Sequence, residues 1–220
     1  MTSDGLQATN KARMLEYGLN RLCPGIFCFS TTRHGGVSTG NYASLNCTPY
    51  TGDDLDCVRR NQEILLSALP QRPRELIIPW QTHGTQVLAV DEAFLSAGKE
   101  QRHDLLQGID ALVTRLPGIC LCISTADCIP ILCYDTRLKV AAAIHAGWRG
   151  TVARIAEKTL HTMAGIYGTE GKDVMVCIGP GISAEAFEVG DEVYEAFRDA
   201  GFEMSCIAVR KEKWHIDLWE

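Results

Sequence analysis

The chain lacks a hydrophobic run long enough to cross a membrane. No stretch of its 220 residues approaches the roughly 18 consecutive apolar residues that a membrane-spanning helix needs. The first ten residues also lack the apolar centre of a secretory signal peptide. We therefore expect a cytoplasmic protein that does not act at a membrane.

Positive charge is scarce as well. The chain has 21 Lys and Arg residues against 27 Asp and Glu, which gives a formal net charge of −6 and a pI near 5.5. Proteins that bind nucleic acids or membrane surfaces in general present a basic face. We therefore expect neither as a partner, although one well-placed arginine could still hold a small anion such as phosphate.

Paired metal or redox motifs are missing too. Ten cysteines include no CxxC pair, which argues against a zinc ribbon and against a thioredoxin-like motif. The six histidines include no His-x-His pair. Most of the cysteines fall in apolar, strand-like runs, where Cys behaves as a small hydrophobic residue. These are Cys28, Cys120, Cys122, Cys133, Cys177 and Cys206.

The pattern of apolar residues predicts an α/β protein. With 46% hydrophobic and 22% charged residues, the chain can bury a sizeable core. Short polar connections between the strand-like runs of residues 109–145 favour antiparallel pairing. We predict a single domain whose central mixed β-sheet is layered with helices. Strands are expected at 25–30, 75–79, 86–90, 111–114, 119–124, 129–134, 140–144 and 173–178, helices at 53–69, 151–165 and 191–200, and mainly loop at 91–108.

The chain is expected to form one domain behind a short arm. Residues 1–24 start with a polar, mixed segment, which we interpret as an N-terminal arm, and residues 25–220 form the domain. The sequence stops after Trp214–Glu220 without a polar tail or a helix cap. We therefore expect the domain to lack its C-terminal segment.

Three residues far apart in the sequence have the surroundings of metal ligands. His83, Cys128 and His145 each lie next to Gly or Pro, or close to one, at or near the end of a strand-like run. Strand ends deliver side chains to a site with little positional freedom. Two imidazoles and one thiolate leave a tetrahedral zinc ion with one open position, which is typical of a catalytic site. The alternative is that these are ordinary polar or core residues.

The turn after His145 indicates an anion site. In His145-Ala-Gly-Trp-Arg-Gly, a strand is followed by a glycine turn and a helix that starts near Thr151. Such a turn presents backbone N–H groups to an anion, and the guanidinium of Arg149 suits phosphate. The alternative is a plain helix start with a solvated Arg149 and a packed Trp148.

Two further charged residues are candidates. Asp127 adjoins the cysteine and could orient a metal ligand or act as a general base, or it could be a turn residue bonded to its own backbone. Arg33 precedes His-Gly-Gly at a strand end, where it could grip an anion or belong to a plain glycine loop.

Seven short motifs together resemble one protein family. The motifs are Thr31–Ser38 (TTRHGGVS), Ser44–Asn46 (SLN), Gln81–Gly84 (QTHG), Asp110–Thr114 (DALVT), Ala126–Pro130 (ADCIP), His145–Gly150 (HAGWRG) and Ile178–Ile182 (IGPGI). With these motifs the chain is similar, from about residue 25 onward, to the laccase-domain family, also called multicopper polyphenol oxidoreductases and more recently described as purine nucleoside phosphorylases.

The resemblance implies a set of site residues and a reaction. It implies that His83, Cys128 and His145 bind the metal, the same three residues that the chemistry proposes. It also implies phosphorolysis of adenosine, inosine, guanosine or methylthioadenosine, and deamination of adenosine. We expect Asp127, Cys128 and Arg149 to be catalytic, and Arg33, Asn46 and Arg149 to bind the nucleoside or phosphate.

Three functions remain open at this point. The first is a zinc-dependent purine nucleoside phosphorylase with adenosine deaminase activity. The second is a copper-dependent polyphenol oxidase, which six histidines disfavour because a multicopper centre needs many clustered ligands. The third is a non-catalytic interaction module that a metal stabilises. The oligomeric state cannot be inferred from the sequence.

Overall fold

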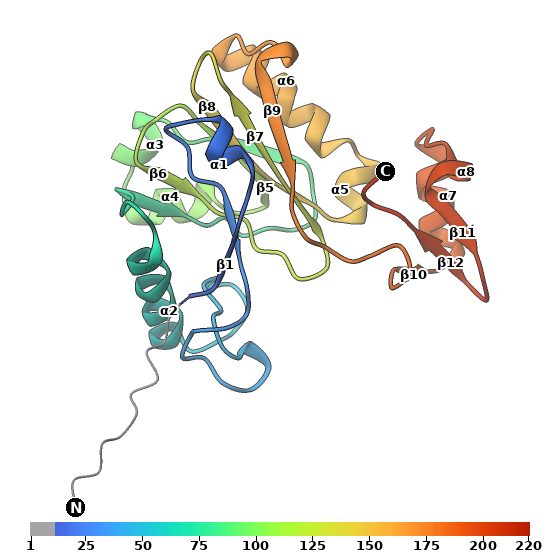
Figure 1. Ribbon diagram of the computed structural model, residues 1–220, viewed down its shortest axis with the longest axis horizontal. Helices are drawn as coiled ribbons and strands as arrows, with labels where there is room; N and C mark the ends of the chain where they lie inside the picture. Colours follow the sequence, from blue (N-terminus) through green and yellow to red (C-terminus); the bar gives the residue numbers. More distant parts are fainter. Residues whose placement is uncertain (1–11) are drawn as a thin grey trace, which may run out of the picture. The chain divides into compact units, whose positions relative to one another are not determined.

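The computed structural model describes residues 12–220 and has a mixed α/β fold, as predicted (Figure 1). The chain divides into two compact units, Met1–Pro73 and Arg74–Glu220, which we call the N-terminal and C-terminal units. The expected boundary after residue 24 stays a prediction, and the first eleven residues of the expected arm lie outside the described part.

The N-terminal unit contains a small sheet and one long helix. Strand β1 (Met14–Glu16) pairs antiparallel with β2 (Phe29–Thr31), and α1 (Leu19–Leu22) lies between them in the chain. The later part holds η1 (Gly40–Tyr42) and α2 (Leu55–Ala68). Helix α2 starts where the sequence predicted, because the Asp54 carboxylate accepts hydrogen bonds from the first free N–H groups of the helix.

A mixed five-stranded sheet forms the centre of the C-terminal unit. Its strand order is β4-β5-β8-β7-β9. Neighbouring strands pair antiparallel except β4 and β5, which are parallel. The strands are β4 (Gln86–Ala89), β5 (Ile109–Thr114), β7 (Ile129–Asp135), β8 (Val140–Ala146) and β9 (Val174–Ile178).

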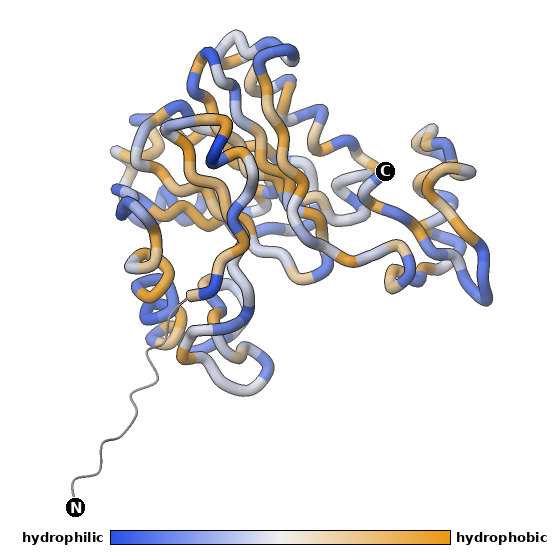
Figure 2. Tube along the Cα trace, in the orientation of Figure 1, coloured by the Kyte–Doolittle hydropathy of each residue, from blue (hydrophilic) through white to orange (hydrophobic). Residues whose placement is uncertain are grey.

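Successive residues of β5 point to opposite faces of this sheet, and both faces are covered. Ala111 and Val113 pack in a cluster with residues of α6 (Ile155–Tyr167). Leu112 packs instead with residues of β3 (Glu75–Ile77) and α3 (Glu92–Ser96). The apolar residues accordingly concentrate on the central strands (Figure 2). Strand β3 itself pairs parallel with β6 (Ile119–Leu121).

A second, smaller sheet lies in the last part of the chain (Figure 1). It has the order β10-β12-β11 and packs against α7 through a core that includes Val193, Phe197 and Ile216. The elements are β10 (Glu188–Val189), α7 (Asp191–Asp199), α8 (Met204–Ile207), β11 (Ala208–Arg210) and β12 (Trp214–Ile216). The short helix η2 (Gly171–Asp173) comes earlier, directly before β9.

Several local expectations were wrong. Residues 91–108, expected as mainly loop, contain α3 and α4 (Lys99–Leu105). Asp91 caps α3 by accepting a hydrogen bond from the Phe94 N–H, and the Phe94 side chain packs into the core. The helix expected at 151–165 is two helices, α5 (Trp148–Val152) and α6, since Arg154 breaks it with a φ of 61°. Cys206 lies in α8 and is exposed. Across residues 12–220, we find no helix with the length and apolar character needed to span a bilayer.

Candidate metal centre

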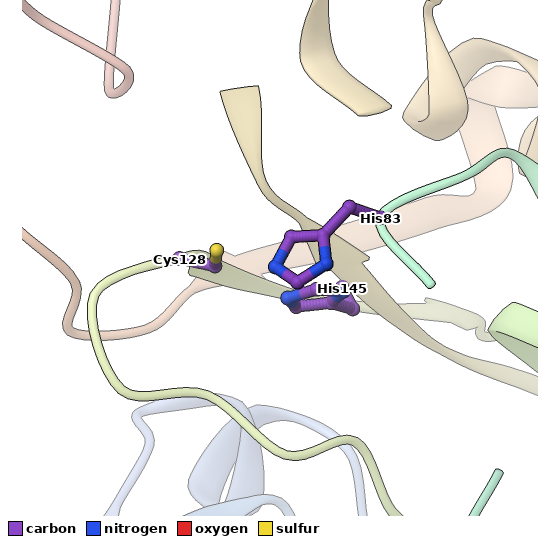
Figure 3. A group of neighbouring side chains, drawn as sticks. All are labelled: His83, Cys128 and His145. Atoms are coloured by element: carbon purple, nitrogen blue, oxygen red, sulfur yellow. The ribbon is translucent and has the colours of Figure 1, made fainter. Parts of the chain in front are cut away.

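His83, Cys128 and His145 come together at one end of the five-stranded sheet (Figure 3). One atom from each side chain, a ring nitrogen or the sulfur, lies within 4.8 Å of the other two. His145 belongs to β8, Cys128 immediately precedes β7, and His83 lies in the turn before β4. His145 is buried, Cys128 is half-buried and His83 is exposed, so the group opens to solvent on the His83 side. Their binding of a metal stays a prediction.

Strand register explains how Cys128 reaches His145. In the β7–β8 pair, Pro130 lies opposite His145 and Ile129 opposite Ala146. Continuing this register by one residue places Cys128 across from Gly147. A Cβ atom at Gly147 would lie 3.0 Å from the Cys128 sulfur and 3.0 Å from Cδ2 of His83. Any larger residue at position 147 would therefore push the Cys128 thiol or the His83 ring out of its present position.

A second glycine packs against the cysteine segment. The Ile182 N–H donates to the Asp127 carbonyl at 2.7 Å, and a Cβ at Gly181 would lie 2.9 Å from that oxygen and 2.4 Å from Cδ1 of Ile129. The Ile178–Ile182 motif thus packs directly on the backbone that carries Cys128.

A buried carboxylate that the sequence analysis did not select lies beside His145. The β5–β8 register pairs Ala111 with Ile144, so Asp110 falls next to His145 on the neighbouring strand. Asp110 is fully buried, and its Oδ1 lies 2.8 Å from Nδ1 of His145. The sequence feature that could have pointed to Asp110 is an aspartate near the start of an otherwise apolar strand. This is unusual because a buried carboxylate needs hydrogen-bond partners.

The same carboxylate holds the His83 turn. The N–H groups of Thr82, His83 and Gly84 donate to it at 3.2, 3.0 and 2.7 Å. Asp110 is therefore the carboxylate that contacts both histidine-bearing segments. Asp127 itself is exposed, and its roles as an orienting residue and as a general base stay predictions.

The electrostatics differ between the two histidines of the group. Partial desolvation and the neighbouring His145 and Arg149 lower the pKa of His83, which favours its neutral ring. Burial opposes the charge of His145, but hydrogen bonds with Asp110 and Cys128 outweigh it and raise the pKa of His145 to about 9. Burial likewise opposes the charge of Asp110, yet its hydrogen bonds hold the pKa of Asp110 below its usual value.

Arg149 lies in α5, two residues from Gly147, and is exposed. Its Cζ lies 4.2 Å from the centre of the Trp148 ring, a cation–π contact that limits where the guanidinium can point. Its charge contributes to the lowered pKa of His83, so the cation lies close to the group. Helix α5 has only five residues, so the guanidinium, rather than a helix dipole, is the group that would attract an anion here.

Arg33 and Asn46, the two other expected substrate residues, belong to the N-terminal unit. Nε of Arg33 donates to the Ala43 carbonyl at 3.0 Å. Nδ2 of Asn46 donates to Oγ1 of Thr51 at 2.9 Å and to Oδ2 of Asp53 at 3.0 Å. Both side chains shape the loop between β2 and α2, and their contact with substrate stays a prediction.

Comparison with known proteins gives consistent results. The family described as multi-copper polyphenol oxidoreductase laccase matches residues 27–220. A purine nucleoside phosphorylase of Bacteroides thetaiotaomicron is 56% identical over 218 residues, covering 98% of this chain and 81% of that protein. Adenosine deaminase RL5, from an unknown prokaryotic organism, is 40% identical over 197 residues, covering 88% of this chain and 75% of that protein.

The crystal structure of a Neisseria meningitidis protein, NMB0706, superposes with a TM-score of 0.76 at 32% identity, covering 94% of this chain and 79% of that one. The family match spans most of the chain and includes all three residues of the candidate metal centre. The chain therefore belongs to the multi-copper polyphenol oxidoreductase laccase family.

Proposed function

We propose that this chain is a zinc-dependent purine nucleoside phosphorylase that also deaminates adenosine. The observation that carries the proposal is the convergence of His83, Cys128 and His145 within 4.8 Å on the solvent-facing end of a rigid sheet. The names of two relatives, a purine nucleoside phosphorylase and an adenosine deaminase, support the same reading. The proposed substrates are adenosine, inosine, guanosine and methylthioadenosine, with phosphate as the second substrate.

The donor set fits zinc. Imidazole and thiolate groups are common zinc ligands, and three protein ligands leave the open position found in catalytic zinc sites. Zinc held there would supply a Lewis acid that stabilises developing negative charge and makes a nearby water more acidic. Asp110 supports the fit, because its contact with Nδ1 leaves Nε2 of His145 as the ring nitrogen that could bind a metal.

The residues around the group suit an anionic co-substrate. Phosphorolysis requires a phosphate oxygen to attack the anomeric carbon of the ribose while the purine leaves. The Arg149 guanidinium, restrained on Trp148, would hold phosphate oxygens on the open side of His83. In this proposal Asp127 moves a proton to or from the purine or a water, and Arg33 and Asn46 add contacts to the nucleoside or phosphate.

The main rival is a copper-dependent polyphenol oxidase, which the description of the family names. A multicopper centre needs several copper ions, each with its own ligands. Within residues 12–220, which include all six histidines and all ten cysteines, one group of three side chains is placed to hold a metal. Copper at that position would displace zinc, since copper ranks higher for nitrogen and sulfur ligands. With one such group of ligands, we expect at most one tightly bound copper ion per chain.

Product analysis with adenosine tests the proposal. Zinc-loaded protein is incubated with adenosine in the presence and absence of phosphate, with Cys128→Ser as the control. Phosphate-dependent adenine indicates phosphorolysis, inosine indicates deamination, and hypoxanthine indicates both. If no purine product formed while a copper-loaded sample bound several copper ions and reduced oxygen with phenols, the oxidase would replace our proposal. If the zinc-loaded protein formed no product of either kind, the chain would be a non-catalytic, metal-stabilised module.

A further inference from the structure

One buried carboxylate contacts both histidine-bearing segments of the candidate metal centre. All four hydrogen bonds to Asp110 come from His145 or from the turn that carries His83. Asp110 has no exposed surface. A buried charge is unfavourable unless it is fully hydrogen-bonded, so these four contacts define where the carboxylate and its partners can sit.

The contact between Asp110 and His145 distinguishes the two nitrogens of the imidazole ring. A carboxylate only accepts hydrogen bonds, so the proton of the bond between Oδ1 and the ring lies on Nδ1. Nε2 is then the ring nitrogen left to bind a metal, and the ligand atoms of Cys128 and His83 lie within 4.8 Å of the ligand atom of His145. A hydrogen bond of this kind restricts rotation of the ring and makes Nε2 a better donor.

The other three contacts hold the His83 turn. His83 has a φ of 60°, a left-handed conformation that is unfavourable for a residue other than glycine. In this turn the three successive N–H groups of Thr82, His83 and Gly84 all point at Asp110. Charge-assisted hydrogen bonds are stronger than neutral ones, so the carboxylate can offset the unfavourable backbone conformation of His83.

We propose that Asp110 is the positioning residue of the metal centre: through His145 and the His83 turn it places two of the three ligands at once. This inference rests on the proposed metal site. It differs from a general structural role, because the four contacts all involve segments that carry a ligand and none involves the helices that cover the sheet. Removing the charge should therefore weaken metal binding more than it weakens folding.

The matched control is a second buried aspartate of the same sheet. Asp135, at the end of β7, is also fully buried, and its Oδ1 accepts from the N–H groups of Arg137 and Leu138 at 2.9 and 2.8 Å. It lies at the opposite end of β7 from Cys128, roughly 20 Å away along a strand of this length. Asp135→Asn thus removes a buried, turn-holding charge without touching the metal ligands.

The affinities of Asp110→Asn, Asp135→Asn and the wild type for zinc and cobalt are measured by competition with a chromophoric chelator. Circular dichroism monitors the folded fraction. We expect Asp110→Asn to lower metal affinity about 10–100-fold, the range found for such outer ligands, and Asp135→Asn to change it less than about 3-fold. Equal affinities of Asp110→Asn and the wild type would overturn the inference while leaving the metal site intact. If the wild type bound no zinc, both the inference about Asp110 and the proposed function would be wrong.

A measurement on the wild type covers the case in which Asp110→Asn does not fold. In zinc-loaded protein labelled with ¹⁵N-histidine, we expect His145 to carry its proton on Nδ1 and to bind metal through Nε2. A spectrum with the proton on Nε2 would overturn the inference regardless of how the variant behaves. Weak metal binding by Asp110→Asn, combined with a wild type that binds zinc but turns over no nucleoside, would support the inference and refute only the proposed function.

Discussion

Gly147→Ala should damage the metal centre while sparing the fold. The new Cβ would lie 3.0 Å from the Cys128 sulfur and from Cδ2 of His83, where ordinary contacts are about 3.5–4.0 Å. Both side chains would have to move by roughly 0.5–1 Å. Protein–metal distances vary by only about 0.2 Å from their ideal values, so a shift of this size is incompatible with unchanged coordination. We expect zinc affinity to fall at least about 10-fold, or about 1.4 kcal/mol.

The backbone conformation of residue 147 is compatible with alanine. Gly147 has a φ of −75°, which alanine adopts freely, so the fold should lose little stability. Gly165→Ala in α6 is the matched control: the chemical change is the same, the position is an exposed helix interior, and nothing lies within 4 Å of its Cβ. It should stabilise the protein by up to about 1 kcal/mol and leave the metal affinity unchanged.

Chelator competition gives the metal affinities, and urea melts of metal-free protein give the stabilities. If the zinc affinity of Gly147→Ala were within about 2-fold of that of the wild type, the close contacts of the new Cβ would not affect metal coordination. If the variant lost as much free energy of unfolding as free energy of zinc binding, Gly147 would be needed for folding rather than for the metal centre.

Three further predictions concern the expected site residues. Cys128→Ser should lose most of its bound zinc in elemental analysis, and full stoichiometric zinc in the variant would contradict the ligand assignment. Arg149→Ala should raise the KM for phosphate more than the KM for nucleoside, with Arg33→Ala behaving similarly; an unchanged phosphate KM would place Arg149 outside the binding site. The folded-state pKa of His145, about 9 against 6.5 in the unfolded chain, contributes stability that is fully present below about pH 6.5 and is lost as pH rises through about 9. Urea melts of metal-free protein should show a loss of up to about 3 kcal/mol over that interval, and His145→Asn, which lacks the titrating ring, should show a smaller one.

The strands of the central sheet were predictable because each one is a local apolar run between polar turns. Residues 129–134 and 140–144 were expected as strands and occur as Ile129–Asp135 and Val140–Ala146. Helices α3 and α4 were missed because each is too short to show a helical period, and their positions depend on a cap and one buried phenylalanine. The two-residue strand β10 is shorter still and carries no period of its own.

The sequence by itself determined the chemistry of the candidate centre. A histidine or cysteine within two residues of glycine or proline at a strand end is a local pattern, and the three such residues were identified without knowing how the strands pair. The tertiary structure decided which groups surround them. Asp110 meets His145 only through the β5–β8 register, and the sulfur of Cys128 meets Gly147 only through the β7–β8 register. Register depends on the packing of whole strand faces against α6, α3 and β3, so it cannot be derived from any one segment of sequence.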